Sequence, residues 1–304
     1  MARAAAFYYA TTFCWRNPFQ EAVAPLQQAR SVAFSYGDVE FALISTTLLS
    51  FVQFNLLPIP DLVAAIRESQ ATMKRYGQQV NLKLVQPQLY LLLSCSGEIS
   101  RDFSEWQKTP EGMMVVYEAG DSGSLNASWI HYFRMTVAFI FHDFQEACRC
   151  SRKCTDLLEN PTGCADITMP CLLDCVLSIE MIRQNPWNVS RHLRVRKWIR
   201  QLHRWATDSP LNVLGKLHLA QAEAASVYGR RECAYMKYVS AIALSEKSGF
   251  LFQTALAHEL TGKHFLRIGS EALATRHLHD AVRSYRVWGA TAKADHLVTE
   301  LRLV

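Results

Sequence analysis

Apolar residues recur along most of the 304-residue chain at intervals of three and four, the spacing that places them on one face of an α-helix. Short polar or glycine-containing connections separate these periodic segments. The pattern predicts helices at 3–15, 18–36, 38–56, 60–77, 79–96, 125–141, 143–159, 166–184, 190–206, 213–228, 230–248, 250–268, 270–288 and 290–302. The sequence therefore predicts an all-α protein.

One connection is much longer than the others. Residues 97–124 contain Thr109-Pro110-Glu111-Gly112 and Gly120-Asp121-Ser122-Gly123, which are turn-forming runs. We expect a surface loop or a break between two helical stacks there. The expected organisation is N-terminal helical repeats at 1–96, the loop at 97–124, and C-terminal repeats at 125–304 that are clearest at 213–304.

The C-terminal residues repeat with a shift of about 40. Gly229 falls on Gly269, and Gly249 falls on Gly289. Ala222, Ala225, Ala234, Tyr238 and Ala241 fall on Gly262, Phe265, Ala274, Leu278 and Ala281. Small residues at such positions let two helices approach closely, bulky residues fill the groove between them, and glycine permits the positive φ that ends a helix. These spacings are typical of tetratricopeptide hairpins and predict an α-solenoid, an α-α superhelix of stacked helical pairs.

The second half of this signature recurs nearer the N-terminus. Ala22, Leu26, Ala29 and Gly37 repeat it, and Ala147, Ser151 and Cys154 form a weaker copy without the glycine. Because the copies are far apart in sequence, we expect the whole chain to be a helical array.

The chain resembles the tetratricopeptide-like helical region of large multidomain signalling proteins. In those proteins a kinase-like domain and a predicted AAA/STAND-type NTPase precede the region, and sensor, histidine-kinase or cyclase domains follow it. The resemblance is carried by Trp205-Ala206, Pro210, Asn212, Lys216, Ala220-Gln221-Ala222-Glu223, Ala255-Leu256-Ala257-His258-Glu259-Leu260, Tyr285 and Trp288-Gly289-Ala290-Thr291-Ala292-Lys293, and upstream by Trp15, Pro18, Gly37-Asp38 and Phe41-Ala42. It implies a role in protein interaction or in coupling sensor and effector domains, with no active site in this region. The sequence departs from the family in lacking the flanking domains and in its cysteine-rich middle.

Composition narrows the classes of protein further. Half of the residues are hydrophobic and 19% are charged, which suits a large buried core. The net charge of +5 is too small for a dedicated nucleic-acid binder, and no apolar run is long enough to span a bilayer. Nine cysteines without a recognisable secretory signal indicate a reducing compartment, so we expect a cytoplasmic protein.

Catalytic motifs are not found. Gly215-Lys216-Leu217 and Gly262-Lys263-His264 lack the earlier glycine and the hydroxyl residue of a phosphate-binding loop. Gly120-Asp121-Ser122-Gly123-Ser124 is similar to a serine-protease nucleophile segment, but the first histidine of the chain, His131, follows it instead of preceding it. We therefore expect no enzymatic activity and no cofactor.

Two pairs of cysteines are spaced four residues apart, Cys150 with Cys154 and Cys171 with Cys175, on helices expected to be adjacent. Four such thiols could form two disulfides or hold zinc, which leaves a thiol-redox or zinc-binding protein as an alternative. Cys154, however, occupies a small-residue position of the repeat, and buried cysteine commonly acts as a small hydrophobe. We favour a structural role for all four.

A basic segment runs from Arg191 to Arg204, with no acidic residue between Met181 and Thr207. Helical spacing predicts that Val195, Trp198, Ile199 and Leu202 face the core. The residues expected to face solvent, and hence the partner-binding candidates, are Arg194, Arg196, Lys197, Arg200 and Arg204. This helix could be an ordinary solvated face or could bind an anionic partner, with nucleic acid the less favoured one.

Four histidines, His258, His264, His277 and His279, fall on one predicted hairpin. Their spacing matches no recognised metal site, so packing or capping roles are expected. The preferred hypothesis is a non-catalytic scaffold that binds a protein partner or neighbouring domains.

Overall fold

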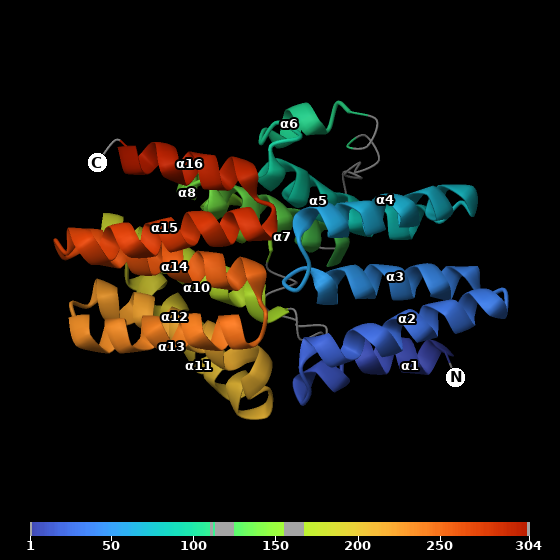
Figure 1. The fold of residues 1–304 in the computed structure, drawn as a ribbon, viewed down its shortest axis with the longest axis horizontal. Coiled ribbons are helices and arrows are strands. Elements are labelled where there is room, and N and C mark those ends of the chain that lie inside the picture. Colours follow the sequence, from blue (N-terminus) through green and yellow to red (C-terminus); the bar gives the residue numbers. More distant parts are fainter. Residues whose placement is uncertain (1, 110–111, 113–124, 155–166, 303–304) are drawn as a thin grey trace. The chain divides into compact units, whose positions relative to one another are not determined.

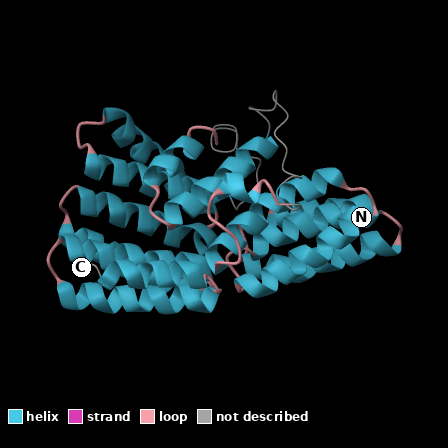
Figure 2. Cartoon of the chain, turned by 90° about the horizontal axis from the view of Figure 1, so that it is seen from above, coloured by secondary structure: helices cyan, strands magenta, loops and turns pink. Residues whose placement is uncertain are grey.

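The chain folds into helices. The computed structural model describes residues 2–109, 112, 125–154 and 167–302, and within these ranges every regular element is helical (Figure 2). The all-α class expected from the hydrophobic periodicity is confirmed.

The chain divides into two compact units, residues 1–167 and 168–304. Unit 1 contains α1 (Ala2–Ala10), the 3-10 helix η1 (Phe13–Trp15), α2 (Phe19–Ser35), α3 (Val39–Gln53), α4 (Ile59–Arg75), α5 (Gln79–Ser96), α6 (Phe103–Trp106), α7 (Leu125–Ile140) and α8 (Phe144–Ser151). Unit 2 contains α10 (Thr168–Gln184), α11 (Val189–Asp208), α12 (Pro210–Val227), α13 (Arg231–Lys247), α14 (Leu251–Arg267), α15 (Glu271–Trp288) and α16 (Thr291–Arg302).

Most predicted boundaries agree with these helices within three residues. The predicted helix at 3–15 is divided into α1 and η1, and the short helix α6 lies in the segment expected to be a loop. The helix predicted at 143–159 ends at Ser151, and its last predicted residues lie outside the described ranges. The division of the chain also differs from the expected break at 97–124, because α5 packs on α7 across that segment within unit 1.

Both units are built from consecutive antiparallel helices (Figure 1). In unit 1 the helices α1, α3, α5 and α7 form a continuous inner row, since each contacts the next member of the row. In unit 2, α10, α12 and α14 form the same kind of row. The intervening helices α2, α4 and α8, and α11, α13 and α15, each pack on an inner helix next to them in sequence.

The repeat positions are buried where the sequence pattern places them. Ala22, Leu26, Ala29, Ala147, Ser151, Cys154, Ala234, Tyr238, Ala241, Ala274, Leu278 and Ala281 are all at most 5% exposed. Gly37, Gly249 and Gly289 follow α2, α13 and α15 with positive φ, which is the conformation that ends these helices. The sequence pattern contains one further copy of the repeat signature, in α4, that was not predicted. Leu62, Ile66 and Ser69 of α4 are buried and Gly77 has positive φ, but the first position holds leucine instead of a small residue.

Gly262 shows why this position of α14 carries a small residue. A Cβ atom added there would lie 2.5 Å from Cγ of Leu278 on α15, well inside contact distance. Leu278 is itself only 1% exposed. The close approach of α14 and α15 therefore depends on the missing side chain.

Three buried carboxylates connect the helices of unit 2. Asp174 of α10 accepts hydrogen bonds from the Arg194 guanidinium and the Trp198 indole N–H of α11, both at 2.5 Å. Glu223 of α12 accepts from Arg183 of α10 at 2.6 Å and from the Tyr238 hydroxyl of α13. Each acid thus bonds an aromatic side chain of the next helix as well as a cation.

Glu259 of α14 repeats this arrangement. It accepts from the Tyr285 hydroxyl of α15 at 2.7 Å, from Lys293 of α16 at 3.0 Å and from Lys263 at 2.9 Å. Burial lowers the pKa of Lys293, and the adjacent Glu259 opposes that change. For Glu223, burial opposes ionisation, but the Arg183 and Arg267 guanidinium groups and the Tyr238 hydroxyl together outweigh it and hold the pKa of the carboxyl below its usual range.

We expect the substitution Gly262→Ala to lower the free energy of unfolding by about 1–2 kcal/mol. Overpacking against Leu278 typically costs about 1–3 kcal/mol, and the better helix propensity of alanine returns up to about 1 kcal/mol. Urea denaturation of the full chain measures the change. Leu278→Ala should then cost less in the Gly262→Ala background than in the wild type. Equal costs in the two backgrounds would contradict this contact.

Candidate partner-binding surface

Five polar residues that carry the family resemblance are buried. Asn212, Lys216, Glu223, Glu259 and Lys293 are each at most 2% exposed. Besides the carboxylate contacts above, Lys216 donates to the Asn212 carbonyl at 2.7 Å. These residues stabilise the interior of unit 2, so a binding surface must consist of other residues.

The basic segment lies on α11, the second helix of unit 2. Its start is fixed by Asn188, whose side chain accepts a hydrogen bond from the Arg191 backbone N–H and so caps the helix. Val195, Trp198 and Leu202 are buried as predicted, whereas Ile199 is only half-buried. The opposite face of α11 is consequently left toward solvent.

The structure separates the five basic candidates into two groups. Arg194 lies beside the buried face and pairs with Asp174, whose side chain is fully buried. Arg196, Lys197, Arg200 and Arg204 are exposed, and the Lys197 ammonium lies 4.8 Å from the Trp198 ring centroid. Arg194 is therefore part of the fold, and four candidates remain at the surface.

Apolar side chains lie next to these basic residues. Val189 and Leu193 occupy the same exposed stripe of α11 and are 67% and 58% exposed, and Trp187 in the preceding turn is 89% exposed. Large apolar side chains at this exposure can be covered by a partner. We call the combined set the α11 surface: Trp187, Val189, Leu193, Arg196, Lys197, Arg200 and Arg204. Sequence analysis found its basic part but missed the apolar part.

His192 holds the start of α11 against the neighbouring helix. One ring nitrogen lies 2.8 Å from the Pro186 carbonyl oxygen and the other 2.8 Å from the Tyr228 hydroxyl, next to the end of α12. The two rings also stack, with centroids 5.8 Å apart. These contacts fix the turn that carries Trp187.

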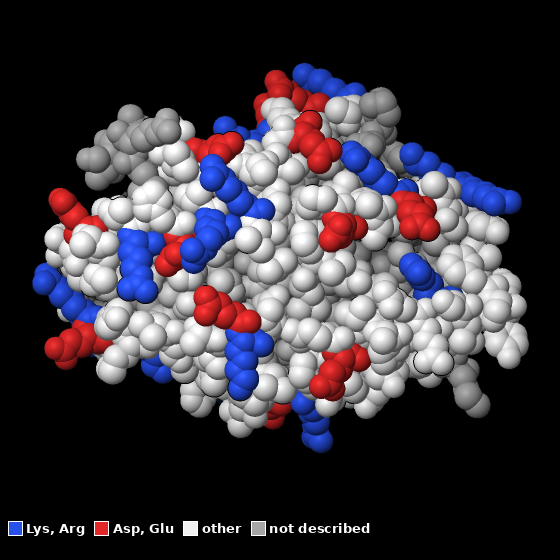
Figure 3. Space-filling model, in the orientation of Figure 1, with Lys and Arg blue, Asp and Glu red and all other residues white. Residues whose placement is uncertain are grey.

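The charge of the α11 surface is a local feature. On the face seen in Figure 3, basic and acidic side chains alternate without an extensive field of one sign. Within 181–207, by contrast, there is no acidic residue at all. An anionic partner would be attracted to this stretch of the chain in particular.

The four candidate cysteines are buried. Cys150 is in α8 and Cys154 follows its end, while Cys171 and Cys175 are both in α10. No disulfide joins two of the eight described cysteines. Burial raises the pKa of the Cys150 thiol to about 12, with Glu146 adding to the effect, and burial also raises the pKa of Cys171 and Cys175. Such thiols are poor nucleophiles at neutral pH.

The described residues of unit 1 line at least two cavities. One of about 640 Å³ is bounded by α7, α8 and the segment around α6, and its Arg134 and Arg149 side chains both bind Glu146 on the same wall. The other, about 400 Å³, lies among α2, α3 and α4 and is lined by apolar and uncharged polar residues with Arg30 and Glu68. The basic groups that bind Glu146 are already neutralised there, so neither cavity offers the charge of the α11 surface.

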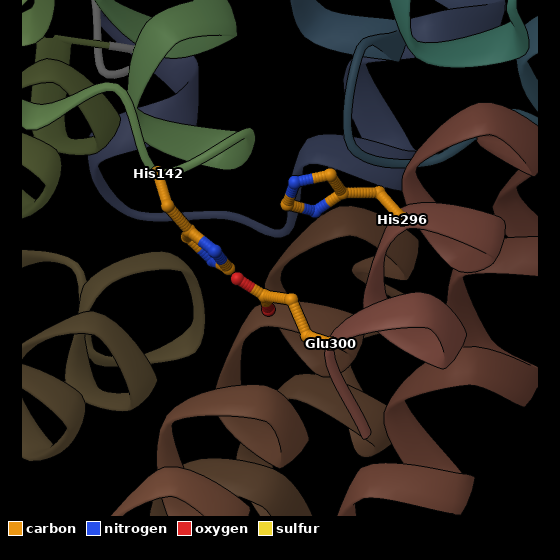
Figure 4. A group of neighbouring side chains, drawn as sticks. All are labelled: His142, His296 and Glu300. Atoms are coloured by element: carbon orange, nitrogen blue, oxygen red, sulfur yellow. The ribbon is translucent and has the colours of Figure 1, made fainter. Parts of the chain in front are cut away.

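Figure 4 draws His142, from the turn after α7, with His296 and Glu300 of α16. His296 and Glu300 are four residues apart and share one side of the helix. His142 belongs to unit 1 and the other two to unit 2, and we assign no site to the three.

The chain matches no protein-family model and no curated protein. None of the described helices combines the length and the apolar character that crossing a bilayer requires.

The placement of Arg194 generates a direct test. Arg194→Met should lower the free energy of unfolding by about 1–3 kcal/mol, because it removes a charged hydrogen-bond donor from the buried Asp174 carboxylate. Arg200→Met, at an exposed position of the same helix, should change it by less than about 0.5 kcal/mol. Urea denaturation compares the two variants. Equal losses would show that Arg194 is an ordinary surface residue.

Proposed function

We propose that this chain is a non-catalytic helical-repeat scaffold, an α-solenoid of the tetratricopeptide type, that binds an acidic segment of a protein partner or neighbouring domain through the α11 surface. The proposal rests on one observation: exposed apolar and exposed basic side chains lie next to one another on one stripe of α11.

The repeat architecture supports the scaffold part of the proposal. Consecutive antiparallel helices with a continuous inner row are the arrangement in which tetratricopeptide arrays stack. The resemblance to the helical region of signalling proteins implies the same kind of role. Because five polar residues of the resemblance are buried, we assign them to the fold and assign the choice of partner to exposed residues.

The chemistry of the α11 surface supports an acidic partner. Basic side chains attract carboxylates over a distance, and Trp187, Val189 and Leu193 offer apolar contact once the partner is close. Exposed tryptophan and arginine are the side chains that most often dominate the energy of protein interfaces. The phosphates of a nucleic acid would pair with the basic side chains but would give the aliphatic side chains no apolar contact.

A site-specific photo-crosslinker tests this proposal in cells. Placed at Leu193 of the full chain, it should capture a distinct protein, whereas at Met236 of α13, which is also well exposed, it should not. Reversing the charge of Arg196 and Arg200 to Glu should reduce capture at Leu193 by at least about tenfold. Reversing Arg231 and Lys247 of α13 gives the same change in net charge and should leave capture intact.

The outcome decides between the classes of partner. Identical products at the two positions, or capture that survives the Arg196 and Arg200 reversal, would contradict the proposal. Capture of nucleic acid with a steep dependence on salt would replace the protein partner with an anionic polymer.

A further inference from the structure

Two histidines and an aspartate meet between α14 and α15, away from the α11 surface. His258 lies on α14, and His277 and Asp280 lie three residues apart on α15, so that both face the same helix. Each residue offers one ligating atom, and the three atoms lie within 4.8 Å of one another. We propose that His258, His277 and Asp280 bind a divalent transition-metal ion of the Zn²⁺ type.

The spacing of the two imidazoles suits such an ion. Nδ1 of His258 lies 3.3 Å from Nδ1 of His277. Two nitrogens that each bind Zn²⁺ at about 2.0–2.1 Å in tetrahedral geometry are about 3.3–3.4 Å apart. The two ligands therefore already stand at the separation that a metal would impose.

An outer carboxylate orients His258. Its other ring nitrogen, Nε2, lies 3.7 Å from the Glu246 carboxylate of α13. A histidine that ligates a metal through one nitrogen commonly directs the N–H of the other to a carboxylate. Glu246 favours the tautomer with hydrogen on Nε2, which leaves the lone pair of Nδ1 directed toward His277.

The surroundings hold the other ligands in place. The His277 ring stacks on Phe265, with the ring planes 10° apart and the centroids at 5.7 Å. Asp280 binds Arg283 at 2.8 Å through one oxygen, and its second oxygen remains for a metal. Burial lowers the pKa of both His258 and His277.

The donor set indicates the class of metal. Two imidazoles and one carboxylate suit Zn²⁺ and similar ions better than Mg²⁺ or Ca²⁺, which prefer oxygen. Three protein ligands leave a fourth position for water, as in open zinc sites. Because the ligands come from two helices, the bound metal would also link α14 to α15.

Zinc binding to the full, reduced chain tests the site. Isothermal titration with Zn²⁺ should reveal a site whose affinity falls more than about 100-fold in His277→Ala and in Asp280→Asn. The first substitution removes a direct ligand, and the second replaces the anionic carboxylate with a neutral and weaker amide oxygen. Glu246→Gln should lose about 10–100-fold, the usual effect of an outer-shell carboxylate. His279→Ala, an exposed histidine two residues from His277, should bind as the wild type does. Circular dichroism checks that every variant is folded.

Cobalt substitution separates this site from the cysteines. The Co²⁺ bound at the site should show ligand-field bands without the thiolate charge-transfer bands that cysteine ligation produces. Wild-type affinity in both His277→Ala and Asp280→Asn, or bound cobalt that is ligated by thiolates alone, would overturn the proposal. Asp280 is half-exposed, so its variant keeps the test valid if the His277 variant does not fold.

Discussion

Burying a carboxylate costs folding free energy unless cations and hydrogen-bond donors surround it. Unit 2 buries three carboxylates that are surrounded in this way. Asp174, Glu223 and Glu259 are at most 2% exposed, and each has partners on at least one other helix. Apolar packing alone would tolerate some sliding of one helix along the next. A charged group with directional partners does not, because a shift breaks its hydrogen bonds. We infer that these acids fix the register of successive helices.

This constraint also separates structural residues from functional candidates. Arg194 belongs to the basic segment but pairs with the buried Asp174, so it contributes to helix packing. The basic residues that remain exposed lie on the opposite stripe of α11. The buried residues of the resemblance are affected in the same way, because Glu223 bonds Arg183 of α10 and Glu259 bonds Lys293 of α16. The residues left available to a partner are exposed ones such as Trp187 and Leu193.

Local periodicity was sufficient to place most helices and their buried faces, since an apolar stripe reports directly on the helix that carries it. It was not sufficient for contacts between helices. Arg194 stands four residues before Trp198, which could have indicated a shared side, but only the fold supplies Asp174 as the acceptor. The apolar part of the α11 surface and the meeting of His258 with His277 also depend on neighbouring elements. The short helix α6 was missed because four residues give no periodic signal.

The pair Glu259 and Lys293, which links α14 to α16, offers the most direct test of the claim that buried charges set the register. Free energies of unfolding measured for Glu259→Gln, Lys293→Met and the double variant form a thermodynamic cycle. The account predicts that each single substitution costs about 1–3 kcal/mol, since it removes a charged hydrogen-bond partner of a buried group, and that the double variant costs at least about 1 kcal/mol less than the sum. Strictly additive losses would contradict it.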